Sequence, residues 1–345
     1  MVIVKSWMKL GPGLIASTLI TALGLTACGS DPDKAAEFTK SFQAALQSDQ
    51  DTKYSAAEAQ CVAKPLVLAL TVKQLEAKKI TPKQVTAAKD LDDLNLGASA
   101  SQATAIADEI VRCVDPSRNL LEAAKESNPD LKADAKAQKC LRDNLRKKSV
   151  YRDNLRDSIE KGSKYEPDNE MLARFALQTM GECDLALYPR SAYVEAGVSS
   201  FNSNTKDSPL TESNAECFMG GLVDVITPEK LGREGIDPPA FEDEDGPNVS
   251  DVVNRDDVEK LAKKFEECVD LVALIRKVVD RLRVFDAFPQ AFVDCYVGRL
   301  QNDPQITRAF RDAYIAGFLG DNEAAANIDF TALGRELGGA CAEGL

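Results

Sequence analysis

Eight cysteines recur along this 345-residue chain at an almost fixed spacing. They are Cys61, Cys113, Cys140, Cys183, Cys217, Cys268, Cys295 and Cys341. Counted from Cys61, every second one follows the previous one after 77 to 79 residues. A fixed period of this length is typical of tandem copies of one structural unit. We therefore predict four related units of about 78 residues, the last of them shortened.

The residues beside these cysteines repeat as well. After the first cysteine of each unit, an apolar residue stands at position +1 and a leucine at position +5. The leucines are Leu66, Leu145, Leu222 and Leu300. Because positions +1 and +5 share one face of a helix, each stretch predicts the buried face of an early helix. Cys113 and Cys268 share a second pattern, since each begins the sequence Cys-Val-Asp.

The rest of the chain has a helical pattern almost throughout. Ser55-x-x-Glu58 has the form of a capping box, and residues 33–47 place apolar side chains along one face of a helix. The sequence lacks the alternation of apolar and polar residues that marks strands. The predicted fold class is therefore all-α, and Pro65 is expected to kink or end the first helix of its unit.

These boundaries give the predicted organisation. Residues 1–27 form a signal segment, and residues 28–50 form a tether with one amphipathic helix. The four units then occupy residues 51–126, 127–205, 206–281 and 282–345. A helical unit of this size has a thin core, so one disulfide worth about 2–4 kcal/mol would supply much of its stability.

Two pairing schemes are open for the cysteines. Pairing within units joins the early cysteine of each unit to the late one, with separations of 52, 43, 51 and 46 residues. This scheme uses all eight cysteines, and we favour it. Pairing between neighbouring units, for example Cys113 with Cys140, leaves Cys61 and Cys341 over unless the two ends of the chain meet.

The N-terminal segment has the charge order and the length of a signal peptide. Lys5 and Lys9 precede an uncharged apolar stretch over residues 10–25, which is short for a transmembrane helix. The stretch runs into Leu25-Thr26-Ala27-Cys28, which resembles the lipobox of bacterial lipoproteins. The resemblance implies that Cys28 carries fatty acyl chains such as palmitate and becomes the first residue of the mature protein. The alternative is an ordinary signal peptide that is cut nearby and leaves Cys28 as a bystander.

Composition excludes several classes of function. The chain contains no histidine, so Ser-His-Asp and Cys-His arrangements and histidine-based zinc sites are impossible. Its 42 basic and 55 acidic residues give a net charge of −13, and loss of Lys5 and Lys9 with the signal segment makes it −15. An acidic surface repels nucleic acids and anionic lipid headgroups. We therefore expect no nucleic-acid binding, and membrane contact through the acyl chains on Cys28 without a basic patch.

The densest acidic segment, Glu242-Asp243-Glu244-Asp245-Gly246, raises the question of a calcium site. If Gly246 is the sixth position of a calcium loop, Phe241 and Val252 fall at the first and twelfth positions, where ligands are required. The pattern therefore fails, and we interpret the segment as a solvated loop. We predict no metal and no cofactor.

The fourth unit contains two aromatic stripes at helical spacing. One comprises Phe285, Phe288, Phe292 and Tyr296, and the other Phe310, Tyr314 and Phe318. We interpret both as core faces, and the alternative is an apolar pocket for an acyl chain. The acid pairs available to an enzyme are Glu266 with Glu267, and Asp312 with Asp321. Nothing in the sequence sets these acids apart from the others, so we predict no catalytic residue.

Together, Cys-apolar-x-x-x-Leu and Cys-Val-Asp resemble the two-cysteine helical units of exported actinobacterial proteins, a family that implies no particular activity. The leading hypothesis is a binding or scaffold protein that is lipid-anchored on the extracytoplasmic face of the cell membrane. Its partners would be the bilayer, through acylated Cys28, and an unidentified envelope protein. The alternatives are a carrier of an apolar ligand and a carboxylate-dependent envelope enzyme.

Overall fold

The computed structural model describes residues 31–48, 54–88, 94, 96–204, 210–241, 249–281, 288–319, 338–339 and 341–342. Within these ranges the regular elements are all helices and no strand occurs, which confirms the all-α fold class. The chain separates into two compact units, a first unit of residues 1–187 and a second unit of residues 188–345. Each unit contains two disulfides.

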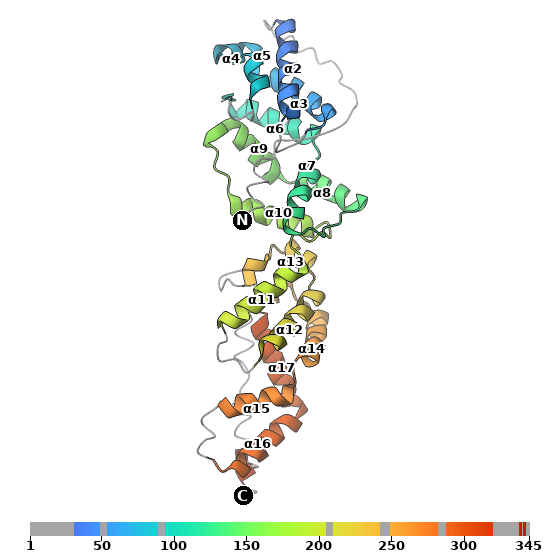
Figure 1. The fold of residues 1–345 in the computed structure, drawn as a ribbon, viewed down its shortest axis with the longest axis vertical. Helices are drawn as coiled ribbons and strands as arrows, with labels where there is room; N and C mark the ends of the chain where they lie inside the picture. The colour runs from blue at the N-terminus through green and yellow to red at the C-terminus, as the bar shows by residue number, and fades with distance from the viewer. Residues whose placement is uncertain are drawn as a thin grey trace. The chain divides into compact units, whose positions relative to one another are not determined.

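The first unit is a chain of helices that pack in pairs (Figure 1). Its α-helices are α2 (Pro32–Ser48), α3 (Ala56–Leu70), α4 (Val72–Ala77), α5 (Pro82–Ala87), α6 (Ala100–Cys113), α7 (Pro116–Ser127), α8 (Ala135–Lys147), α9 (Ser149–Lys161) and α10 (Asn169–Gly181). Helix α2 packs against α3 and α5, α3 against α6, and α6 against α9. As expected for an amphipathic helix, α2 buries Phe38, Phe42 and Leu46.

The second unit has the same kind of core. Its elements are α11 (Arg190–Asn204), α12 (Glu212–Val225), α13 (Pro228–Arg233), η3 (Pro238–Phe241), η4 (Val249–Val252), α14 (Arg255–Cys268), α15 (Leu271–Arg281), α16 (Gln290–Asn302) and α17 (Pro304–Phe318). Phe218 of α12 meets Phe265 of α14 edge-on, with ring centroids 5.2 Å apart. Tyr314 of α17 stacks on the same Phe265 at 6.0 Å, so three helices share one aromatic centre.

The two units repeat one order of elements at a spacing of 155 to 156 residues. Helix α11 packs on α12 as α2 packs on α3, α12 packs on α14 as α3 packs on α6, and α14 packs on α17 as α6 packs on α9. The caps repeat too: Ser55 and Thr211 begin α3 and α12 with capping boxes, and Ser99 and Asn254 do so for α6 and α14. Each cap therefore holds its helix start with the same side chain-to-backbone contacts in both units.

The turn after the short second helix is also the same in both units. The Ile80 N–H donates to the Leu75 carbonyl at 2.9 Å, and the Ile236 N–H donates to the Leu231 carbonyl at 3.0 Å. Both leucines are fully buried. The turn requires a left-handed residue, which is Lys79 with φ +61° in the first unit and Gly235 with φ +80° in the second.

The Cys-Val-Asp pattern is a helix-to-helix junction. Cys113 is the last residue of α6, Val114 is buried, and the Asp115 carboxylate accepts the Ser117 N–H at 3.0 Å to cap α7. In the second unit Asp270 accepts the Val272 N–H at 3.0 Å in the same way after Cys268. The pattern thus ends one helix at a disulfide and starts the next helix three residues later.

The prediction of four equivalent units of about 78 residues is not confirmed, because the copies alternate. After Cys61 and Cys217, the second helix is short and begins after a threonine at position +10. After Cys140 and Cys295 it begins after position +8 and has 13 or 15 residues. In addition, the boundary at 187/188 lies inside the predicted unit 127–205.

The expected helix end at Pro65 is wrong, because α3 continues through Pro65 to Leu70. Proline removes one backbone donor in the helix interior. The next turn buries Leu66, Val67 and Leu70. Burial of these side chains offsets the lost hydrogen bond, so packing decides the outcome.

Leu145→Ala should lower the free energy of unfolding by about 2–5 kcal/mol, because it removes buried methyl groups and leaves a cavity. Leu145 is fully buried in α8. Since the chain separates into two compact units, we expect urea unfolding followed by circular dichroism to show an early transition and a later one. The exposed control Lys147→Ala should change stability by less than about 0.5 kcal/mol. One transition shifted as a whole would contradict independent units.

Lys79→Gly should raise the free energy of unfolding by about 0.5–1 kcal/mol, because glycine adopts the left-handed conformation without the steric cost that lysine incurs. Lys79 has φ +61° and is exposed, so few other contacts change. Thermal unfolding of the variant measures the gain. Lys78→Gly, one residue earlier at φ −83°, is the matched control and should be destabilising. Equal effects of the two variants would show that the backbone angle is not the cause.

Candidate functional sites

The four disulfides follow the predicted pairing within units, and the pairing between neighbouring units is wrong. The structure joins Cys61 to Cys113, Cys140 to Cys183, Cys217 to Cys268 and Cys295 to Cys341, with Cα–Cα distances of 5.7, 5.6, 5.5 and 5.9 Å. The first cysteine of each pair stands six residues after the residue that caps its helix. Those caps are Ser55, Asp134, Thr211 and Pro289. Each disulfide is therefore attached to its first helix at the same distance from the helix N-terminus.

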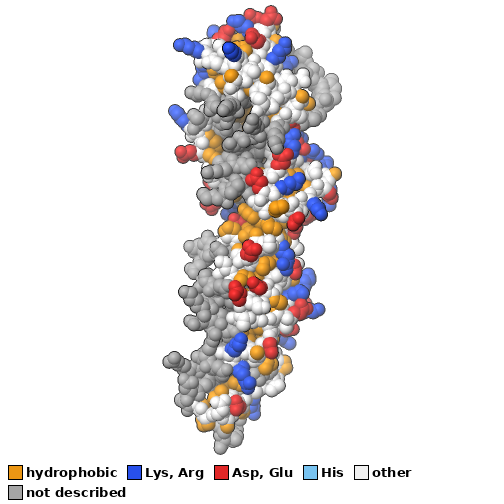
Figure 2. Space-filling view, viewed as in Figure 1, with side chains coloured by type: hydrophobic (Ala, Val, Ile, Leu, Met, Phe, Trp, Pro, Cys, Tyr) orange, Lys and Arg blue, Asp and Glu red, His pale blue; other side chains and the backbone are white. Residues whose placement is uncertain are grey.

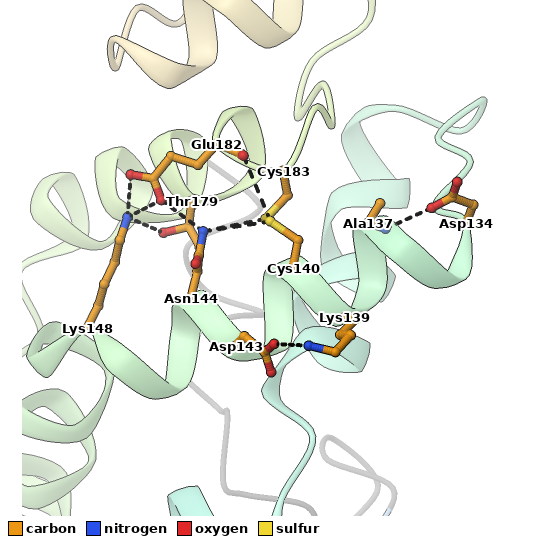
Figure 3. Close-up of a disulfide and its surroundings, with 10 residues drawn as sticks. All are labelled: Asp134, Ala137, Lys139, Cys140, Asp143, Asn144, Lys148, Thr179, Glu182 and Cys183. Carbon is orange, nitrogen blue, oxygen red and sulfur yellow. Dashed lines mark hydrogen bonds and ion pairs between the residues drawn. A yellow bond between two sulfur atoms is a disulfide. The ribbon is translucent and has the colours of Figure 1, made fainter.

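A polar network surrounds the Cys140–Cys183 disulfide (Figure 3). The side-chain nitrogen of Asn144 lies 3.6 Å from Sγ of Cys183 and 3.1 Å from a carboxylate oxygen of Glu182. Lys148 donates to Glu182 at 2.8 Å and to the Thr179 hydroxyl at 3.4 Å. The lysine and the carboxylate are engaged with each other, so this cluster fixes α8 against the end of α10 and offers no nucleophile.

The two units differ in the polar contacts between their helices. In the first unit Glu58, which is fully buried, accepts from Arg118 at 2.8 Å. At the position of Glu58 the second unit has Asn214, whose amide donates to the Cys268 carbonyl at 2.7 Å. The position of Arg118 is Ala273 in the second unit, so the acid and its partner have changed together. This coupling is expected because a buried carboxylate left without its cation is costly.

A second contact changes in the same manner. Gln74 of α4 and Gln102 of α6 form an amide pair, and the Gln102 nitrogen is 2.7 Å from the Gln74 oxygen. At the corresponding positions Lys230 donates to Asp257 at 2.5 Å. Burial by itself raises the pKa of Asp257, but the hydrogen bonds from Lys230 and from the Asn254 N–H outweigh it. The pKa of Asp257 therefore lies below its ordinary value.

Sequence reasoning recognised the capping-box residues but missed their partners across the core. Glu58 was recognised as the third residue of a capped helix, and Gln102 holds the same position in α6. Their partners lie 60 and 28 residues away. The signal that could have found them is the comparison of the chain with itself at a spacing of 155 to 156 residues, which places Glu58 with Asn214 and Arg118 with Ala273.

The aromatic stripes of the C-terminal part contribute mainly to the core. Phe310 is buried with Leu300 and Ile306, and Tyr314 stacks on Phe265. Phe288 precedes α16, and its ring stacks on that of Phe292 at 4.7 Å. Within α16 the rings of Phe292 and Tyr296 stack at 6.2 Å. Of these, Phe288 has 46% of its surface exposed. Phe285 and the side chain of Phe318 lie outside the described residues.

Three of the four acids considered for an enzyme are engaged in ion pairs. Arg311 contacts Glu266 at 2.6 Å and Asp312 at 2.7 Å, and Lys264 contacts Glu267 at 2.7 Å. The hydrogen bond from Lys264 lowers the pKa of Glu267. A carboxyl group that serves as a general acid near neutral pH needs a raised pKa, so Glu267 has the opposite shift. Asp321 lies outside the described residues.

Three other predicted features fall wholly or partly outside the described residues. These are Cys28, the signal segment and the acidic segment from Glu242 to Gly246. Among the residues that the structure does describe, no three acidic or cysteine side chains are grouped as a metal site would require. In the same ranges no helix has the length and apolar character needed to cross a membrane.

Comparison with known proteins adds no relative: the chain matches no family model, no curated protein and no solved structure.

Lys230→Met should lower the free energy of unfolding by about 1–3 kcal/mol at pH 7, because it leaves the nearly buried Asp257 carboxylate without its main cation. Asp257 has a lowered pKa in the folded protein, so its stabilisation is present above the unfolded pKa of about 3.9 and is lost as the pH falls through the folded pKa. The difference between the natural chain and the variant should therefore be full at pH 7 and shrink below about pH 4.

Urea unfolding at several pH values measures this difference. The matched control is Gln74→Met at the corresponding position of the first unit, where the partner is the neutral Gln102. Its cost should not depend on pH. A pH-independent cost for Lys230→Met as well would show that the Lys230–Asp257 pair does not act through charge.

Proposed function

We propose that this chain is an exported lipoprotein that is anchored to the membrane by Cys28 and acts as a binding or scaffold protein of the cell envelope. The observation that carries the proposal is the use of cysteine. The four disulfides take up eight of the nine cysteines, and the ninth is the lipobox-like Cys28. Disulfides of this number are typical of exported proteins, since the cytosol keeps thiols reduced.

The architecture supports a binding role over a catalytic one. The chain has no histidine, and the acids considered for an enzyme that lie in the described ranges form ion pairs with Lys264 and Arg311. We infer that the two units are copies of one ancestral two-disulfide unit, because caps, cysteines and turns recur at 155 to 156 residues. Duplicated helical units commonly build extended surfaces for partners. A scaffold that presents two related surfaces from one anchor fits this arrangement.

Cys28→Ala should release the protein from the membrane, because it removes the residue that would carry the acyl chains. A myristoyl-sized chain alone gives only marginal binding, so loss of every chain should move most of the protein into the soluble fraction. Membranes washed with salt and then partitioned into detergent would measure this. The control is Ser30→Ala, two residues away, which should leave partitioning unchanged. A Cys28→Ala protein that stays in the detergent phase would refute the anchor.

The binding role is tested separately by crosslinking in living cells. A scaffold should give a defined set of crosslinked envelope proteins with the natural chain, and this set should be reduced when Cys28→Ala removes the chain from the membrane. Unchanged crosslinks in the released protein would show that anchoring has no part in partner binding.

A further inference from the structure

One exposed part of the first unit is basic, although the protein as a whole is acidic. Five lysines of α3, α4 and α5 and the adjoining turn form a group that we call the lysine face. They are Lys64, Lys73, Lys78, Lys79 and Lys83, and all are exposed. The only acid between residues 59 and 88 is Glu76, which is paired with Lys34 at 2.6 Å. Leu68 lies on the same stretch of α3 with 65% of its surface exposed.

The second unit shows that the fold does not require these lysines. The corresponding residues are Gly220, Glu229, Glu234, Gly235 and Pro239. None is basic, and two have the opposite charge. The position of exposed Leu68 is Asp224, which forms an ion pair with Arg190 at 2.6 Å. At these positions the same scaffold therefore has five lysines and an exposed leucine in one copy, and three acids without a basic residue in the other.

Lys79 gives a second, independent indication. It occupies the left-handed position of its turn, where the second unit has Gly235. A lysine is unfavourable at such a backbone angle, and residues kept in strained conformations are commonly retained for a function. Lys79 therefore places a basic charge at a position where the local backbone favours glycine.

The lysine face is close to the proposed anchor. Lys34 belongs to the first turn of α2 and contacts Glu76 of α4, so α4 lies beside the start of α2 (Figure 1). Only four residue steps separate Cys28 from Pro32, which at full extension span at most about 14 Å. Figure 2 shows blue basic side chains over this end of the unit, together with red acidic and orange apolar ones. An acylated Cys28 would thus hold this end next to the headgroups.

We propose that the lysine face lies against the anionic headgroups of the membrane to which Cys28 is anchored, with Leu68 reaching the interface. This rests on the proposed lipid anchor and differs from the expectation that membrane contact needs no basic patch. Each lysine near an anionic bilayer contributes about fivefold to membrane affinity, and the effect is confined to about a Debye length from the surface. Asp31, Asp33 and Glu37 at the start of α2 weaken the attraction, whereas the acidic remainder of the protein is repelled and so favours this orientation.

The test uses the lipidated protein in vesicles of phosphatidylcholine alone and of phosphatidylcholine with an equal part of phosphatidylglycerol. A water-soluble amine-acylating reagent is added, and the modification of each lysine is measured by mass spectrometry. We expect labelling of Lys73, Lys78 and Lys79 to fall about fivefold on the anionic vesicles at low salt and to recover at about 0.5 M salt. Lys132 and Lys136, which are exposed elsewhere in the first unit, are the internal controls and should be unchanged.

Two charge-reversal variants complete the test. Lys73→Glu with Lys78→Glu introduces the residues that the second unit has at these positions. This variant should abolish the protection of Lys79 on anionic vesicles. Lys132→Glu with Lys136→Glu makes the same change in charge and should leave that protection intact. Equal labelling on the two kinds of vesicle, or equal protection of the control lysines, would overturn the proposal.

The proposal would also be overturned if an anionic wall polymer protected the lysine face and the anionic vesicles did not. Failure of the anchor itself would appear earlier and differently, because the protein would then not incorporate into either vesicle.

Discussion

Each of the two units contains two disulfides, and each disulfide joins an early segment to a late one. The part of the unit that one disulfide closes depends on this contact. The helices involved have 13 to 15 residues, a length that is marginal in water without packing. A crosslink between positions 43 to 52 residues apart restricts the unfolded chain and so favours the paired helices. Around this fixed point the same apolar positions are buried, including Leu66 and Leu222. The surface is then free to diverge, as the lysine face and its acidic counterpart show.

Much of the fold was predictable because cysteines and caps act locally. The spacing of the cysteines led to the correct pairing, and Ser55-x-x-Glu58 marked a real helix start. The alternation of the copies was not predictable from cysteine spacing alone, because the helix after the first cysteine differs in length while the cysteines keep their period. Pro65 misled for a related reason: its intrinsic preference is local, whereas the buried Leu66 and Leu70 that hold α3 together act through the tertiary structure.

The candidate sites likewise divide into features that are local in the sequence and contacts that form only when the chain folds. The lipobox-like residues before Cys28 could be recognised from sequence, since a processing signal is read as a linear segment. The polar partners could not, because Glu58 and Arg118, or Lys230 and Asp257, meet only after the helices have packed. Exposure has the same limit: nothing in the sequence set Lys64 and Lys73 apart from buried or paired lysines. Comparison of the two units at equivalent positions showed where the charge differs on the same fold, which one position taken alone cannot show.

The placement of the disulfides has a mechanical consequence for a protein held at one end. A pull along the chain passes through each sulfur–sulfur bond and bypasses the residues between the two cysteines, so the loops 62–112, 141–182, 218–267 and 296–340 cannot be drawn out. Only the segments outside these loops can lengthen, by at most about 3.3–3.6 Å per residue. Beyond the proposed anchor at Cys28 they are residues 29–60, 114–139, 184–216, 269–294 and 342–345. Cys113 and Cys268 each end a helix, and the next helix starts three residues later, so the load passes from a covalent bond almost directly to the start of a connector helix. Such a chain would extend in separate steps, one for each segment that lies outside a disulfide loop, while the four loops keep their length.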